Sequence, residues 1–294
     1  MNNQELINAV IKAKTDREIN AIIRIYQLAH KEILQLAKGL NPYQGIDTNY
    51  YMDSTYVANV LYQLSLILKR VEEQTIERTQ SVIRQMAYEG HLFALSNIAA
   101  MGVKPTPASF SIVKTRAVEA AVLLATRQLR DANNSVMEHF QLAIYDGLEN
   151  INKEIAKQKV NDIVATGIAT GRSRIKTTDI LLDTMKKQGL VAMIKSNGHK
   201  IDIAEYADIV VRSQTMQAYN FANVQTIKEN GFDLVRISKH ANPCKKCQPF
   251  EGKVYSISGE HHKYPSVNEL PGGIVGSFHP RCRHTCVPHI EKFN

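Results

Sequence analysis

One long stretch of this chain contains no proline and only one glycine: STYVANVLYQLSLILKRVEEQTIERTQSVIRQMAYEGHLFALSNIAAM, residues 54–101. Its apolar residues return every three or four positions, which is the spacing of one face of an α-helix. The seam that they form is Val57, Leu61, Leu64, Leu68, Val71, Ile76, Ile83 and Met86. The stretch therefore predicts one amphipathic helix, about 70 Å long at about 1.5 Å per residue if Gly90 does not break it.

The residues before this stretch also have a helical pattern. Thr15 with Glu18 fits a capping box, so we expect a second helix to begin at Thr15. Gly39 and Pro42 would end that helix. Residues 41–53 are rich in Asn, Pro and Gly, and this composition predicts a loop.

The helical pattern continues after a break at residues 102–107, which contain Gly and Pro. Apolar residues at helical spacing cover 112–129 and 135–161. A Gly/Thr-rich loop follows at 167–173, and a short helix then runs to residue 188. We therefore expect a mainly α fold with an extended, long-helix body over residues 1–189, which would make the assembly contacts.

The character of the chain changes after residue 189. Asn197-Gly198 lies between two apolar segments, and this dipeptide is a strong signal for a β-hairpin. One more amphipathic helix and two strands are expected after the hairpin. The predicted segments are 190–194 and 200–203 for the hairpin, 204–229 for the helix, and 234–238 and 253–257 for the strands. The sequence thus predicts a small α+β domain over residues 190–294.

Composition excludes some classes of protein and draws attention to the C-terminal region. The chain has 294 residues, 44% of them hydrophobic, but no apolar run approaches the length of about 18 residues that spans a bilayer. The N-terminus shows no secretory signal, and we expect no membrane contact. The net charge is +8, of which residues 236–294 contribute +5. An excess of this kind favours an acidic partner such as DNA, although a solvated surface has the same composition.

All four cysteines and six of the ten histidines lie in that C-terminal region. Cys244 and Cys247 form a CxxC pair, and His279 and Cys282 form an HxxC pair after 31 intervening residues. Two such turns, distant in sequence, can close a tetrahedron of thiolates and imidazole around Zn²⁺. The segment between them is too rich in Gly and Pro to form its own core, so a bound ion would supply much of its folding free energy. The sequence therefore predicts a structural zinc site at Cys244, Cys247, His279 and Cys282.

Other interpretations of these residues remain open. The fourth ligand could be His284, Cys286 or His240 instead of His279, because all of them are close in sequence to the two pairs. The cysteines could also be buried free thiols, a disulfide pair or a redox CxxC. The redox interpretation is the weaker one, since no βαβ pattern surrounds Cys244.

The sequence contains no complete set of catalytic residues, so we expect a protein that is not an enzyme. The alternative is a zinc-stabilised, metal-dependent nuclease of the His-metal-finger type, with which His261, His262 and the cysteines are loosely compatible. Such a nuclease needs a further metal-binding residue on a helix that follows. Only eight residues come after Cys286, so this helix is missing.

Four segments, in order, resemble the minor capsid and head-morphogenesis proteins of tailed bacteriophages. They are Tyr206–Asn220, with Arg212 followed by Ser213 where Thr is usual; Gly231–His240; Gln248–Ser256, which contains Gly-Lys-Val-Tyr-Ser; and Gly276–His284, which contains His-Pro-Arg-Cys-Arg-His. The resemblance covers roughly residues 190–290. Some relatives lack a cysteine at the position of Cys244 and carry His at that of Cys247, which keeps His240 and His284 among the possible ligands.

The resemblance implies a structural virion protein that acts in procapsid assembly and DNA packaging near the portal. Its partners would be the portal protein and the major capsid or scaffold protein, and it would bind DNA without sequence preference. It would be located in the head interior or at the portal vertex, and in the host cytoplasm during assembly. Arg281 and Arg283, which flank Cys282, are candidates for contacts with phosphates or protein carboxylates.

Overall fold

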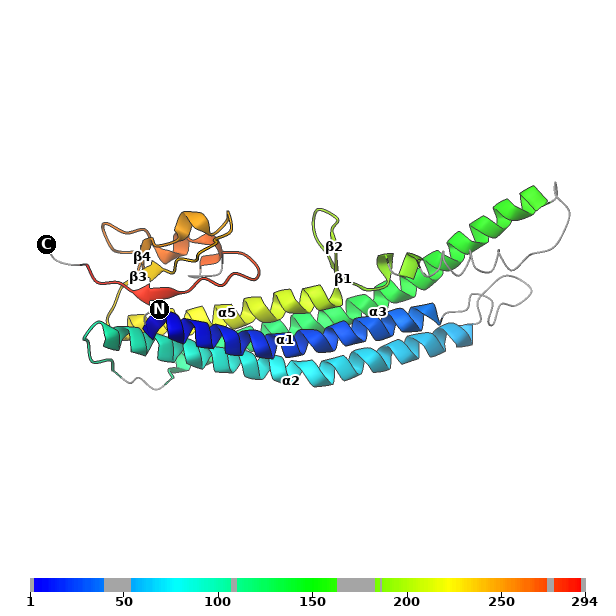
Figure 1. Ribbon diagram of the computed structural model, residues 1–294. Helices are drawn as coiled ribbons and strands as arrows, with labels where there is room; N and C mark the ends of the chain where they lie inside the picture. Colours follow the sequence, from blue (N-terminus) through cyan, green and yellow to red (C-terminus); the bar gives the residue numbers. More distant parts are fainter. Residues whose placement is uncertain are drawn as a thin grey trace. The chain divides into compact units, whose positions relative to one another are not determined.

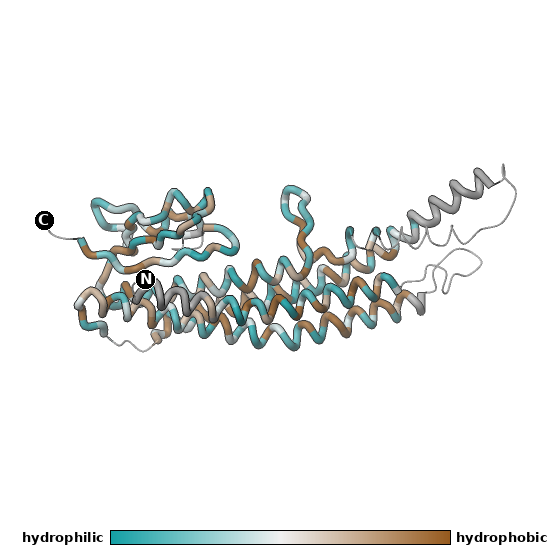
Figure 2. Tube along the Cα trace, viewed as in Figure 1, coloured by the Kyte–Doolittle hydropathy of each residue, from teal (hydrophilic) through white to brown (hydrophobic). Residues whose placement is uncertain are grey.

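The computed structural model describes residues 3–39, 54–106, 110–162, 183–185, 187–273 and 278–291. Helices dominate these residues, which confirms the predicted mainly α fold (Figure 1). The long helices are α1 (Asn3–Lys38), α2 (Ser54–Ala100), α3 (Ile112–Asp162) and α5 (Ile203–Glu229). Figure 2 shows hydrophobic and hydrophilic residues alternating along them, as the amphipathic pattern predicts.

Helix α1 is continuous, so the prediction that a second helix begins at Thr15 is wrong. The Thr15 side chain is buried, and its hydroxyl lies 2.6 Å from the sulfur of Met86 on α2. A capping residue would need to leave the helical conformation and turn its oxygen to the backbone. Here the apolar residues on both sides of Thr15 belong to one helix, and packing against α2 takes precedence over the local signal.

Gly90 does not break α2. Its lack of a side chain permits a close approach of α2 and α5. A Cβ atom at this position would lie 2.2 Å from the backbone oxygen of Tyr219 on α5. The predicted break after α2 is present: Gly102 has φ 81°. The two apolar patterns at 112–129 and 135–161 belong to the single helix α3.

Contacts divide the chain into two units, and α1, α2, α3 and α5 contribute residues to both. Unit 2 comprises Ile23–Thr75 and Leu129–Ala207. Buried residues of three helices form its core: Tyr26 and Ile33, Leu64 and Val71, Leu129 and Phe140. Most of the predicted seam is buried in the structure, and Leu61 and Ile76 are half-buried.

Unit 1 comprises Met1–Ile22, Ile76–Gln128 and Asp208–Asn294. Its helical part buries apolar residues of α1, α2, α3 and α5: Ile19, Ile83, Phe93, Ile98, Val118, Val122, Val210 and Ala222. A polar cluster is buried among these helices. The fully buried Lys114 Nζ lies 2.8 Å from Glu229 Oε2, 3.0 Å from Thr226 Oγ1 and 3.2 Å from His91 Nδ1.

The predicted hairpin is present in unit 2. Strands β1 (Val191–Ile194) and β2 (Lys200–Asp202) pair antiparallel, and Gly198 in the turn has φ 79°. The side chain of Asp202 then accepts hydrogen bonds from the backbone N–H groups of Ala204 and Glu205, as an N-cap of α5 does.

The C-terminal module, residues 230–291, contains a three-stranded antiparallel sheet in the order β4-β3-β5. Its strands are β3 (Leu234–Ile237), β4 (Val254–Ser256) and β5 (Cys286–Pro288), of which β5 was not predicted. The core of the module includes Val235, Tyr255 and Phe278, and it is continuous with Ile227 of α5 and Ala94 of α2. The sheet is thereby attached to the helices of unit 1.

Some predictions lie outside the described residues: the loop at 41–53, the loop at 167–173 and part of the short helix before residue 188. The division of the chain into domains at residues 189 and 190, and the extended form of the body, stay predictions. Among the described helices, none combines the length and the apolar character that crossing a bilayer requires.

Candidate metal centre

The CxxC pair lies on a tight turn between β3 and β4. The carbonyl oxygen of Cys244 accepts hydrogen bonds from the backbone N–H groups of Cys247 and Gln248, each at 3.0 Å. A short 3₁₀ helix, Gln248–Phe250, follows directly, with Pro249 in its first turn. This turn directs the sulfur atoms of both cysteines to the same side.

The HxxC pair lies on a second turn, before β5. The backbone N–H of Cys282 donates to the carbonyl of His279 at 3.1 Å. Arg281 has φ 64°, the left-handed region that residues other than Gly, Asn and Asp adopt at a cost. This strained turn allows His279 and Cys282 to face the first pair.

The structure places the four predicted ligands in two overlapping groups of possible ligands, not in one group of four. The Nε2 atom of His279 lies 3.1 Å from Cys247 Sγ and 3.3 Å from Cys244 Sγ. The sulfur atoms of Cys247 and Cys282 are 3.8 Å apart. Two groups of possible ligands, Cys244/Cys247/His279 and Cys247/Cys282/His284, thus share Cys247. A Cys/His cluster that could hold a metal therefore exists in this chain.

The chemistry and spacing of these donors fit zinc. Two thiolates at about 2.3 Å from Zn²⁺ lie about 3.8 Å apart along the edge of a tetrahedron, and a thiolate and an imidazole lie about 3.5 Å apart. The distance between Cys247 and Cys282 has the first value, and the distances to His279 are slightly shorter than the second. The Nδ1 atom of His279 lies 2.6 Å from the carbonyl of Pro280, so this nitrogen carries the proton and Nε2 is left to bind a metal.

The electrostatics of the thiols also favour a cation. The pKa of Cys244 is lowered, because the Cys247 side chain and the backbone N–H groups of Cys247 and Lys246 hydrogen-bond to its sulfur. The pKa of the Cys247 thiol is raised by burial and by the neighbouring Cys244 and Cys282. Burial opposes ionisation of Cys282, but hydrogen bonds from His284 and from the backbone lower its pKa. A bound cation would oppose both the burial and the neighbouring thiols that raise the pKa of Cys247.

His284 connects the cluster to a buried carboxylate. Its Nδ1 atom lies 3.5 Å from Cys282 Sγ, and its Nε2 atom lies 2.8 Å from Glu251 Oε1. Glu251 also accepts a hydrogen bond from the backbone N–H of His240, whose ring packs on that of His284 at 4.2 Å. Burial lowers the pKa of His284, but Cys282 and Glu251 outweigh that effect and raise it. His284 can therefore bind a metal through Nδ1 or hold Cys282 in place.

Two of the alternative ligands lie outside the groups of possible ligands. Cys286 is fully buried on β5, where burial raises the pKa of its thiol and its sulfur lies 3.5 Å from Asn223 Nδ2. His240 contacts Ser238 Oγ at 3.3 Å and the ring of His284. All four cysteines are free thiols, so none of them forms the disulfide considered above.

The second turn is held against α5 and α1 by charged groups. Arg281 donates its backbone N–H to Ser213 Oγ at 3.3 Å, and its guanidinium pairs with Asp208 at 2.6 Å. Arg283 pairs with Asp16 of α1 at 3.3 Å. The contacts of Arg281 and Arg283 in this structure are thus with carboxylates of their own chain.

Two asparagines of α5 bind the backbone that follows this turn. Asn220 donates to the carbonyl of His284 at 2.9 Å, and Asn223 donates to that of Cys286 at 2.8 Å. Arg212 binds Asp208 and Asp16, each at 2.6 Å. We call Arg212, Ser213, Asn220 and Asn223 the α5 polar face. This face positions the HxxC pair opposite the CxxC pair.

The sequence drew attention to the residues of the Cys/His cluster but missed the groups that position them. Glu251, Asp16 and Asp208 are isolated acidic residues without a motif, and their partners lie far away in the chain. Polar residues at buried helical positions, such as Asn220 and Asn223, are the signal that could have drawn attention to the α5 polar face.

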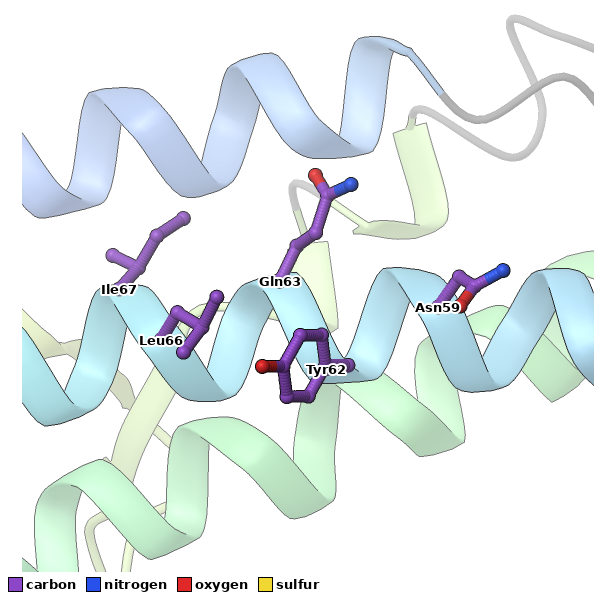
Figure 3. A pocket seen from close by; sticks show the side chains of 5 residues that line it. All are labelled: Asn59, Tyr62, Gln63, Leu66 and Ile67. Carbon is purple, nitrogen blue, oxygen red and sulfur yellow. The ribbon is translucent and has the colours of Figure 1, made fainter.

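The histidines of the nuclease alternative lie apart from the cluster. The rings of His261 and His262 stack on each other at 4.8 Å, and among the described residues neither belongs to a group of possible metal ligands. An open hollow on α2, in unit 2, is lined by Asn59, Tyr62, Gln63, Leu66 and Ile67 (Figure 3). This lining contains no acid, histidine or cysteine, so it carries no catalytic set.

Comparisons with known proteins identify the family. A structural protein of Lactococcus phage LL-H is 27% identical to this chain over 135 residues. The match covers 44% of this chain and 36% of that protein's length. No solved structure matches the chain. The family described as Phage minor capsid protein 2 matches residues 11–294, nearly the whole chain, and this protein belongs to that family.

Proposed function

We propose that this protein is a structural component of the phage head that acts in procapsid assembly and DNA packaging near the portal. Its membership of a minor capsid family and its similarity to a phage structural protein support a structural role. In this proposal the protein is located in the head interior or at the portal vertex, and passes through the host cytoplasm during assembly.

The observation that carries the proposal is the composition of the Cys/His cluster. A catalytic zinc site has three protein ligands and leaves a position for water or substrate, whereas a structural site is closed by four. Cys244, Cys247 and His279 form one group of possible ligands, and Cys282 adjoins it through Cys247 and belongs to a second group with His284, so that the two groups together offer at least four donors. The backbone on both sides of Cys282 is bound to α5. A zinc ion held by these residues would link the two turns and stabilise the C-terminal module on the helices.

Exposed apolar residues on the helices are the expected contacts with the portal, major capsid or scaffold protein. In unit 2, Tyr62 and Leu66 of α2 are 63% and 48% exposed, and Leu142 and Tyr145 of α3 are 57% and 54% exposed. Large exposed apolar groups on a soluble surface are typical of protein–protein contacts.

Metal content and thermal unfolding of the purified full-length protein test the site. We expect about one zinc ion per chain, and a chelator should lower Tm, because loss of the ion removes folding free energy from the module. Cys282→Ala should abolish zinc binding. The matched control is Cys286→Ala, which removes a buried thiol outside the cluster and should keep the ion. A protein without zinc whose Tm does not respond to a chelator would contradict the proposal.

The role in the head is tested with phage in which the gene is disrupted. We expect particles with defective assembly or packaging, and we expect mass spectrometry to find the protein in purified wild-type virions. Tyr62→Ser with Leu66→Ser should fold normally but be incorporated poorly. Normal, DNA-filled heads in the absence of the protein would refute the assembly role.

A further inference from the structure

Charged residues of the C-terminal module fall into two classes, those with a partner and those without. Its arginines are engaged: Arg281 and Arg283 bind aspartates, and Arg236 contacts His289 Nδ1 at 2.7 Å. Lys263 pairs with Glu291 at 2.8 Å. These contacts within the chain reduce the ability of the arginines to bind an external anion.

The acids of the module are engaged as well. Asp233 accepts hydrogen bonds from Ser256 Oγ and from the backbone N–H of Ser258. Glu251 binds His284, and Glu269 belongs to a capping box with Ser266. Among the described acids of the module, only the carboxylate of Glu260 has no recorded partner. Little negative charge is therefore free to neutralise the remaining cations.

Four lysines of the module are exposed, and among the described residues none has an ion-pair or hydrogen-bond partner for its ammonium group. They are Lys239, Lys245, Lys246 and Lys253. Lys245 and Lys246 lie between the two cysteines of the CxxC turn. The stem of Lys239 lies against Gly252, where a Cβ atom would be 2.4 Å from Lys239 Cε, and Lys253 is the next residue. All four thus belong to the connection between β3 and β4.

Backbone hydrogen bonds join the two ends of this connection. The N–H of Ile237 donates to the carbonyl of Lys253 at 3.0 Å, and the N–H of Gly252 donates to the carbonyl of Ile237 at 3.1 Å. The CxxC turn lies between these two ends of the connection. Four exposed lysines, none with an ion-pair or hydrogen-bond partner among the described residues, therefore lie on one short segment whose ends are joined, which we call the lysine surface.

We propose that the lysine surface binds the phosphates of duplex DNA without sequence selectivity. Lysine ammonium groups on flexible stems bind phosphates as point charges, and contacts with the backbone of DNA carry no sequence information. The inference rests on the proposed function in one respect: a protein inside a phage head meets packaged DNA as its most abundant polyanion. Arg281 and Arg283 are not part of this surface, since they bind Asp208 and Asp16.

The test measures binding of the full-length protein to a fluorescently labelled random-sequence duplex by anisotropy at several salt concentrations. The variant replaces Lys239, Lys245, Lys246 and Lys253 by Gln. The matched control replaces four exposed lysines elsewhere, Lys31, Lys104, Lys195 and Lys228, by Gln, and so changes the net charge equally. Zinc content and Tm of both variants are compared with those of the wild type.

We expect the lysine-surface variant to bind at least about tenfold more weakly at moderate salt, and its plot of log K against log salt to become shallower by about 3 to 4. The control should keep most of the wild-type slope. Equal losses in both variants, or no binding by the wild type, would overturn the proposal. Poly-glutamate is added as a second competitor. If it displaces the labelled duplex as well as unlabelled duplex does, the partner of the lysine surface is an acidic protein and the proposal of DNA is overturned.

The failures of the two proposals are distinguishable. A protein that contains zinc and enters the head but does not bind DNA refutes only the lysine surface. A protein that binds DNA through these lysines but lacks zinc refutes only the metal site.

Discussion

The helical part of the chain and its C-terminal module are stabilised in different ways. Where their side chains are described, the helices bury apolar residues at many positions, so that these positions share the stabilisation. The module has strands of three or four residues and a small core that it shares with Ile227 and Ala94. Its second turn is positioned by a few polar contacts with the α5 polar face and, in our proposal, by one metal ion.

This difference shows that a chain can distribute its stability unevenly between long helices and a small module. In the helices, loss of one apolar contact leaves many others. In the module, each residue of the Cys/His cluster and each contact with α5 holds a separate part of a short chain, so that single substitutions should have local but severe effects on stability. Helix α5 contributes to both kinds of stabilisation: its apolar side packs in the helical core, and the α5 polar face binds the module.

The largest loss of stability is expected from a substitution at a position where the helical packing leaves no space for a side chain. Gly90→Ala would place a Cβ atom 2.2 Å from the backbone oxygen of Tyr219, and neither helix backbone can yield easily. We expect a loss of at least about 3 kcal/mol in the free energy of unfolding, measured by denaturant titration. Ala99→Val, at an exposed position of the same helix, is the control and should have little effect. A loss below about 1 kcal/mol would show that the helices can separate at this point.

Substitution of the histidines of the Cys/His cluster is expected to have a smaller effect, which is confined to zinc binding by the module. His279→Ala should abolish zinc binding, whereas His284→Ala should retain the ion with an affinity lowered by about 10- to 100-fold. The reason is that His279 faces two cysteines, while His284 connects Cys282 to Glu251. Competition with a chromogenic chelator measures both affinities. Zinc lost from His284→Ala but kept by His279→Ala would reverse the assignment of the fourth ligand.

The smallest effect on stability is expected from the polar cluster of Lys114, His91, Thr226 and Glu229 within the helices, and this effect depends on pH. Burial and the neighbouring Lys114 lower the pKa of His91 below its usual 6.5, so the folded state resists a proton that the unfolded state accepts. Stability should therefore fall as pH decreases through and below 6.5. The pKa of Glu229 is also lowered: burial opposes this shift, but hydrogen bonds from Lys114, Ser111 and Gln225 outweigh it, so a second loss should follow as pH falls below 4.5.

Comparison of His91→Gln with the wild type isolates the first of these losses, because all other histidines are common to both proteins. Denaturant midpoints between pH 7.5 and 5.5 should decrease less steeply in the variant. Parallel curves for the two proteins would mean that His91 does not contribute.

Much of the fold could be predicted because its signals are local. The seam of α2, the Asn197-Gly198 hairpin and the strands on both sides of the CxxC turn each follow from residues within a few positions of one another. Two predictions failed because the deciding contacts are distant in the chain. The segment around Thr15 packs against Met86, which its capping pattern with Glu18 does not reveal. Strand β5 has no local pattern and forms by pairing with β3.

The sequence by itself determined the helical character of the chain, the donor types at Cys244, Cys247, His279 and Cys282, and the family to which the chain belongs. Only the tertiary structure decided that these donors meet, that Cys286 lies apart from them, and that Arg281 and Arg283 bind aspartates while four lysines stay exposed. The physical reason is range. Periodicity and turn chemistry act over a few residues, whereas the Cys/His cluster and the ion pairs around it join segments up to 267 positions apart.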